Sequence, residues 1–227
     1  MHFFTFITLV AVLVVNLLCT APAAASRSYQ RRHDLDTVKP ISELGWVVPL
    51  LSGTYALPPP AADKTLKYLT LGRGIMTYGC NGKTPGNDQP DYLYQNTDLY
   101  DVTPLAQNLP DEAALHSLVP HFCEYDYAEL RNTSMHCVGR IYNQSDHIIV
   151  NLFGFNVPEF TIETDRIIPS PGGQLVDGYW DHCTSIDKEW EMYRVETAGG
   201  ATPTTCKGHE NSTISVAYAA EYWFYHR

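Results

Sequence analysis

The stretch that decides the fold is TISVAYAAEYWFY, which covers residues 213–225. Its residues alternate between two faces. One face carries Ile214, Val216, Tyr218, Ala220, Tyr222 and Phe224, and the other carries Thr213, Ser215, Ala217, Ala219 and Glu221. A repeat of two is typical of a β-strand, whereas a helix repeats its apolar residues every three or four positions. The stretch therefore predicts a long β-strand near the end of the chain.

The rest of the chain favours further strands. β-prone runs occur at residues 66–70, 75–78, 135–142, 147–155 and 160–168, and residues 190–197 predict the hairpin partner of the last strand. Gly72 and Gly74 separate the first two runs, and residues 105–118 are the best helix candidate. Together with fifteen tyrosines, this pattern predicts an all-β fold. We expect a single-domain β-sandwich or barrel with at most one or two short helices.

A pair of glycines precedes the last strand, within TAGGATPTTC at residues 197–206. A phosphate-binding loop would need a lysine in the loop and a helix after it. Here no lysine comes before Lys207, a predicted strand follows, and the chain contains no G-x-G-x-x-G run. Gly199 and Gly200 are therefore predicted to form a tight or bulged connection with positive φ, and no cofactor is expected.

The N-terminal part of the chain predicts export. Residues 3–18 are almost entirely apolar but fall short of the roughly 20 residues of a membrane helix, and small residues lead to a cleavage pattern that ends at Ala25. Residues 1–25 are therefore predicted to be a signal peptide, with an uncleaved anchor as the alternative. Residues 26–63 are predicted to be a partly extended leader that ends near three consecutive prolines, and residues 64–227 to be the β domain.

Glycosylation sequons and cysteines support a secretory route. The sequons predict glycosylated, solvent-facing asparagines at Asn132, Asn143 and Asn211. Of the six cysteines, Cys19 leaves with the signal peptide, so an odd number remains. An oxidising compartment favours disulfides among them. The protein is predicted to be secreted and extracellular.

Several motifs resemble the secreted fungal and bacterial family catalogued as domain of unknown function 3455. They are TAGGATPTTC leading into VAYAAEYWFY (197–206 and 216–225), GIMTYGC (74–80), LPDEAAL (109–115) and the pair His121-Phe122. The resemblance covers roughly residues 66–227. The chain departs from the family pattern in its middle, where it lacks a tryptophan-glycine stretch and carries Cys123, Cys137 and Cys183.

The resemblance implies a disulfide between Cys80 and Cys206. It leaves open which of Cys123, Cys137 and Cys183 pair with one another. The family has no established activity to transfer. Some members carry the label malate dehydrogenase, which the missing dinucleotide fingerprint and the predicted export disfavour.

The candidate catalytic residues are few. Asp181, His182 and Glu189 lie in an acidic stretch, predicted to be a loop, that would suit glycoside hydrolysis if two carboxyl groups faced each other across a cleft. His116, His121, His136 and Cys137 match no metal-binding spacing, so no metal site is expected. The sequence therefore leaves enzymatic activity uncertain and leans against it.

Charge and aromatic content point to a binding protein. The net charge of −10 disfavours nucleic acids and anionic membranes as partners. Many aromatic residues lie in or beside stretches predicted to be loops, where they would suit stacking or partner contacts: Tyr92, Tyr94, Tyr100, Tyr125, Tyr127, Tyr142, Tyr179 and Trp180. We expect an extracellular binding or interaction protein at a cell wall or host surface, whose partner is a polysaccharide or a protein surface. The alternatives are a secreted hydrolase acting on polysaccharide and a structural cell-surface protein.

Overall fold

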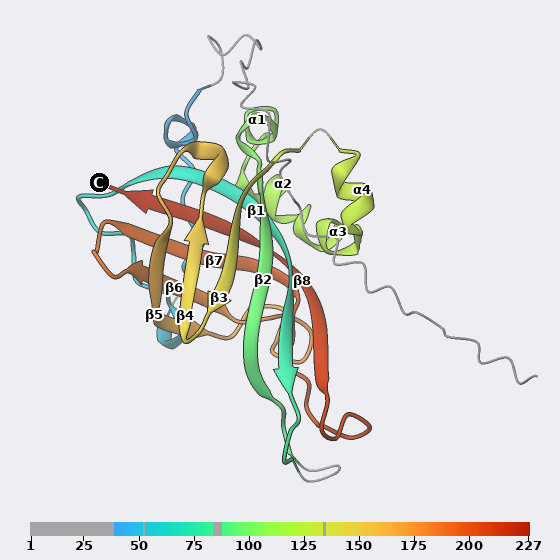
Figure 1. Cartoon of the computed structure of the whole chain (residues 1–227). Coiled ribbons are helices and arrows are strands. Elements are labelled where there is room, and N and C mark those ends of the chain that lie inside the picture. The colour runs from blue at the N-terminus through green and yellow to red at the C-terminus, as the bar shows by residue number, and fades with distance from the viewer. Residues whose placement is uncertain (1–38, 52, 84–87, 134) are drawn as a thin grey trace, which may run out of the picture. The chain divides into compact units, whose positions relative to one another are not determined.

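The structure is a closed, eight-stranded antiparallel β-barrel (Figure 1). This computed structural model describes residues 39–51, 53–83, 88–133 and 135–227. The signal peptide predicted at residues 1–25 lies outside the described residues. Each strand pairs with its neighbours in sequence, and β1 closes the barrel on β8. The strands are β1 (Thr65–Gly79), β2 (Asp91–Asp101), β3 (Cys137–Gln144), β4 (His147–Asn151), β5 (Phe160–Ile168), β6 (Trp180–Ser185), β7 (Trp190–Gly199) and β8 (Thr213–His226). The predicted all-β class is confirmed, and the barrel is the correct alternative.

The last strand has the two faces that its sequence predicts. β8 pairs with β1 on one edge and with β7 on the other. Tyr218, Tyr222 and Phe224 belong to a core cluster inside the barrel, whereas Trp223 and Tyr225 belong to a second cluster on its outer surface. Both faces are apolar because the barrel is filled on the inside and covered on the outside.

β1 is one continuous strand, not the two short runs expected from the sequence. Gly72 and Gly74, expected to end these runs, lie inside the strand. A Cβ atom at Gly72 would come within 2.3 Å of the Tyr222 ring, and one at Gly74 within 2.7 Å of the Tyr218 ring. The glycines therefore make room for two interior tyrosines without breaking the ladder.

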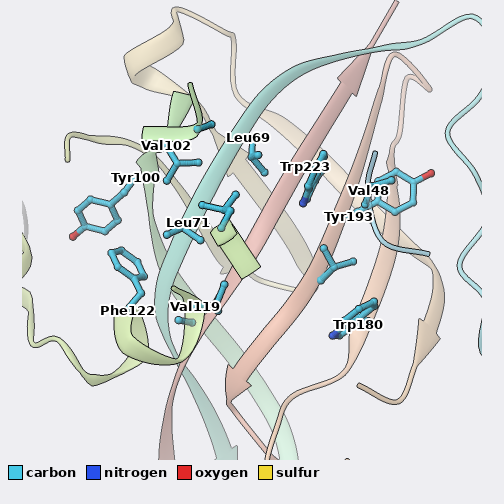
Figure 2. Packing of buried hydrophobic residues seen from close by; sticks show 14 of the residues in the cluster. Val48, Leu69, Leu71, Tyr100, Val102, Val119, Phe122, Trp180, Tyr193 and Trp223 are labelled. Carbon is cyan, nitrogen blue, oxygen red and sulfur yellow. The ribbon is translucent and has the colours of Figure 1, made fainter. Parts of the chain in front are cut away.

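A second core covers the outside of the barrel (Figure 2). Leu69 and Leu71 of β1 pack there with Trp223 of β8, next to residues of the leader and the helices. The leader contributes Ile41, from the 3-10 helix η2 (Ile41–Leu44), and Val48. Two further 3-10 turns are η3 (Gly53–Tyr55) and η4 (Phe153–Phe155). The described part of the leader, from residue 39 on, docks on the barrel because this outer face is too apolar to meet water.

The helices between β2 and β3 are short. They are α1 (Thr103–Ala106), α2 (Glu112–His116), α3 (Val119–Glu124) and α4 (Tyr127–Arg131). The single helix predicted at residues 105–118 is divided because Pro110 lies within it, between α1 and α2. Pro104 and Pro120 each lie at the start of a helix. No helix in the described part of the chain is long and apolar enough to cross a membrane.

The sequence did not indicate two of the strands, β2 and β6. On β2 the buried positions are Gln95, Thr97, Leu99 and Tyr100, and on β6 every residue is buried, including Asp181. Polar side chains face the barrel interior in both strands, so neither shows an apolar alternation. Tyr92, Tyr94, Tyr100 and Asp181, expected in loops, are strand residues.

Candidate ligand site in the barrel mouth

One end of the barrel contains a cavity of about 280 Å³. It lies where β1, β5 and β7 end and where β2, β4 and β6 begin, which is the end opposite the connection from β2 to α1 (Figure 1). Its apolar and aromatic lining consists of Met76, Tyr78, Tyr92, Ile148, Ile167 and Tyr179. Its polar lining consists of Gln95, Thr164, Asp181, Arg194 and Thr202. A mostly apolar pocket with a few convergent polar groups is the usual form of a small-molecule site.

The polar groups centre on a buried ion pair. Arg194 Nη2 lies 2.6 Å from Asp181 Oδ2, and both side chains are about nine-tenths buried. The two residues face each other directly on β7 and β6. Burial raises the pKa of the Asp181 carboxyl, which Arg194 opposes. Burial lowers the pKa of Arg194, but Asp181 together with the nearby Tyr222, Tyr218 and Cys183 raises it above its usual range. The pair places one positive and one negative charge beside the cavity, with no net charge.

A hydrogen-bond network fixes Arg194 from across the barrel. Arg194 Nη1 donates to Gln95 Oε1 at 3.3 Å, although β2 and β7 are not neighbouring strands. Tyr218 donates to the same oxygen at 3.1 Å, and its hydroxyl lies 2.8 Å from that of Tyr222. Arg194 Nε is buried and has no hydrogen-bond partner among the described residues. The guanidinium is therefore held in place while its Nε–H donor stays unused.

The paired glycines form part of the rim. Gly199 and Gly200 have φ values of 68° and 79°, which confirms the predicted positive φ. Gly199 N donates to Asp177 Oδ1 at 3.0 Å, so the turn is tied to the loop before β6. Cys80 and Cys206 form the disulfide that the family resemblance implied. This bond joins the end of β1 to the segment that follows the rim residues Gly200 and Thr202.

The three candidate catalytic residues are not brought together. Asp181 points into the barrel, whereas its neighbour His182 lies on the outer face against the Tyr193 ring, 4.6 Å between centroids. Glu189 lies in the turn before β7 and pairs with Arg227 at 2.9 Å. Neighbouring residues of a strand point to opposite faces, so Asp181 and His182 cannot act on one substrate atom.

His182 is buried as a neutral ring. Its nitrogens lie 3.5 Å from Asp165 and 3.9 Å from Glu191, too far for hydrogen bonds, and neither nitrogen has a partner in the described structure. Burial lowers the pKa of His182 despite these carboxylates. The side chain contributes packing on Tyr193 and no ion pair.

The histidines considered for metal binding are also separate. His116 Nδ1 lies 2.8 Å from Glu221 Oε1, on the outside of the barrel under α2. His121 is exposed, 3.9 Å from Glu124. No group of three or more potential metal ligands occurs in the described ranges.

The remaining thiols and sequons have distinct environments. Cys183 is buried inside the barrel and Cys123 is half-buried, both as thiols, so neither forms the second disulfide considered from the sequence. Burial raises the pKa of both thiols, which disfavours a reactive thiolate. Asn132 and Asn211 are exposed. Asn143 is half-buried, and its side-chain oxygen accepts from Tyr92 of the cavity rim at 3.2 Å.

The comparison with known families extends over the whole barrel. The model of a family described as a protein of unknown function, DUF3455, matches residues 60–226. The chain belongs to the DUF3455 family. No curated protein and no solved structure matches the chain. The match includes every residue that lines the cavity, so the cavity lies within the family domain.

Sequence reasoning identified Asp181 in this DUF3455 domain but not its partner Arg194. The sequence feature that could have pointed to this partner is Arg194 itself, a charged residue within the strand-like run of β7. A charge in a strand that pairs on both edges requires a partner, and Asp181 is the residue opposite. Gln95 and Thr164 gave no such signal, because a polar residue in a strand is common on exposed faces.

Proposed function

We propose that this protein is a secreted binding protein that holds a small, mostly apolar molecule in the mouth of its barrel. The observation that carries the proposal is the 280 Å³ cavity, with apolar walls and a preformed polar centre at Asp181 and Arg194. A cavity of roughly 150 Å³ holds benzene. A site about twice that size suits a molecule of one or two rings.

The rigidity of the polar centre supports binding. Arg194 is held by Asp181 and Gln95, so its position does not depend on the ligand. A preformed site loses less entropy when the ligand enters. The separation of Asp181, His182 and Glu189 gives no support to the alternative of a hydrolase that uses these three residues.

The proposal is tested by titrating the protein with 2-naphthol, a neutral two-ring probe, in a calorimeter. We expect saturable binding with one site per chain. A variant that narrows the mouth, Ile167→Trp, is expected to weaken this binding at least about tenfold, because Ile167 is 56% exposed and lines the cavity.

Ile186→Trp is the matched control, because Ile186 is 55% exposed and lies in the turn after β6, away from the cavity lining. Its affinity for 2-naphthol should equal that of the unmodified protein. Equal weakening in both variants, or no binding at all, would argue against a site in the mouth.

Polysaccharide binding is the second candidate, and it rests on exposed aromatic residues beside the cavity. Tyr92 and Tyr94 are 46% and 48% exposed on β2. Sedimentation with insoluble glucan, chitin and cellulose tests this form of the proposal. If the protein sediments with a polysaccharide, and Tyr94→Ala abolishes this binding whereas Ile167→Trp does not, the result would favour a polymer-binding surface over the cavity.

A further inference from the structure

We infer that the cavity selects an uncharged ligand that carries one hydrogen-bonding group, such as a phenol or an amide, and rejects carboxylates and ammonium ions of the same size. This inference rests on the proposed binding function and names the chemical class of its ligand. The observation that carries it is the internal neutralisation of Arg194 by Asp181.

The argument begins with the balance of charge at the cavity. Asp181 and Arg194 are the charged residues that line it, and their side chains lie 2.6 Å apart. Each satisfies the charge of the other, so neither is available as the counter-ion of a ligand. An anionic ligand beside this pair would be repelled by the Asp181 carboxylate, and a cationic ligand would be repelled by the Arg194 guanidinium.

Burial turns this balance into selectivity. A charged group that leaves water for a mostly apolar cavity loses its hydration, and only a close opposite charge offsets that loss. The walls supplied by Met76, Ile148 and Ile167 offer no such charge. A neutral molecule loses much less hydration and gains the burial of its apolar surface.

The polar lining favours one hydrogen-bonding group on the ligand. Thr164 and Thr202 bring hydroxyl groups to the lining, whereas the unpartnered Arg194 Nε is fully buried and does not open onto the cavity. A ligand oxygen in the cavity would supply an acceptor that a pure hydrocarbon cannot. Hydroxyl and amide groups are uncharged and provide both a donor and an acceptor.

The test compares three probes of one shape at neutral pH by calorimetry: 2-naphthol, 2-naphthoate and 2-naphthylmethylammonium. With the unmodified protein, 2-naphthol is expected to bind at least about tenfold more tightly than either ion. The variant Asp181→Asn leaves the Arg194 charge uncompensated and should reverse the order, so that 2-naphthoate binds more tightly than 2-naphthol. Arg194→Lys keeps both charges and should keep the preference for 2-naphthol.

Each outcome separates the inference from the proposed function. Binding of 2-naphthoate or of the ammonium ion to the unmodified protein with equal or greater affinity overturns the neutral-ligand inference and leaves a binding cavity. Failure of all three probes overturns both. Folding of the variants is checked by near-ultraviolet circular dichroism, and if Asp181→Asn does not fold, the order of the three probes on the unmodified protein decides the question.

Discussion

Two buried acid–base pairs lie on opposite faces of the same sheet, and their surroundings differ. Asp181 and Arg194 face the inside of the barrel and line a cavity. Glu221 lies on the outside, fully buried, where it contacts His116 at 2.8 Å and accepts from Trp223 Nε1 at 2.9 Å. The first pair borders space for a ligand. The second, called the enclosed pair below because Glu221 is fully buried, lies beneath α2 with His116 only partly exposed.

The difference separates binding from stability. A buried charged pair costs hydration wherever it lies, and it is retained only if its geometry offsets that cost. Glu221 connects α2 to the barrel through His116, so it contributes to the stability of the fold. Asp181 and Arg194 also prepare a polar surface inside an apolar cavity. Changes near the mouth should therefore alter affinity, and changes near Glu221 should alter stability alone.

The largest effect is expected from removing the disulfide at the mouth. The double substitution of Cys80 and Cys206 by alanine opens a link across a sequence separation of 126 residues. In the chain-entropy model this lowers the free energy of unfolding by about 4–5 kcal/mol, measured by urea denaturation. The affinity for 2-naphthol should also fall, because the rim residues Gly200 and Thr202 lose their anchor. Unchanged affinity in the folded variant would show that the rim does not depend on this bond.

The next largest effect is expected at the enclosed pair. Glu221→Ala removes the acceptor of both His116 and Trp223 and should lower the free energy of unfolding by about 3–5 kcal/mol. Affinity for 2-naphthol should stay unchanged at a temperature where the variant is folded. Glu189→Ala, at an exposed pair with Arg227, is the control and should change neither quantity. A loss of affinity in Glu221→Ala would contradict the separation of the two faces.

A smaller effect is expected from substitutions that compare two parts of the barrel interior, the packed region around Gly72 and the cavity. Gly72→Ala places a methyl group against the Tyr222 ring and should destabilise the protein by about 1–3 kcal/mol. Thr202→Leu, which adds side-chain volume at the cavity rim, should cost much less because space is available there. Urea denaturation of both variants gives the comparison, and equal losses would indicate that the cavity is as tightly packed as the region around Gly72.

The smallest expected effect is a dependence of stability on pH that comes from the enclosed pair. Burial opposes the charged form of His116, but the hydrogen bond and charge of Glu221 outweigh it and raise the pKa of His116 above its ordinary value of 6.5. A raised pKa means that the folded state binds the proton more tightly than the unfolded state. The stabilisation is therefore complete below pH 6.5 and is lost as the pH rises through the pKa of the folded protein.

This dependence is measured as the urea midpoint between mildly acidic and mildly alkaline pH. Glu221→Gln should remove the part of the slope that arises from His116. If stability depends on pH with the same slope in the unmodified protein and in Glu221→Gln, the dependence arises from another titratable group.

The sequence predicted the fold better than the site. The alternation in β8 and the positive φ at Gly199 and Gly200 follow from local sequence, and the structure confirms both. β2 and β6 were missed because their inward residues, among them Gln95 and Asp181, are polar. Polar residues inside a barrel obscure the alternation that sequence reasoning depends on.

The site itself could not be predicted, because it depends on register. Asp181 meets Arg194 only through the pairing of β6 with β7, and Arg194 meets Gln95 only because the barrel closes. The sequence proposed His182 and Glu189 as partners of Asp181 since they are near it along the chain. In a strand, closeness along the chain places neighbours on opposite faces.

The most direct test of the account is an amide-resolved NMR titration with 2-naphthol. The account predicts that shifts concentrate on residues of the cavity lining, such as Gln95, Arg194 and Gly200, while the amides of His116 and Glu221 keep their positions. Shifts centred on α2 and Glu221, or an unchanged spectrum at high probe concentration, would contradict it.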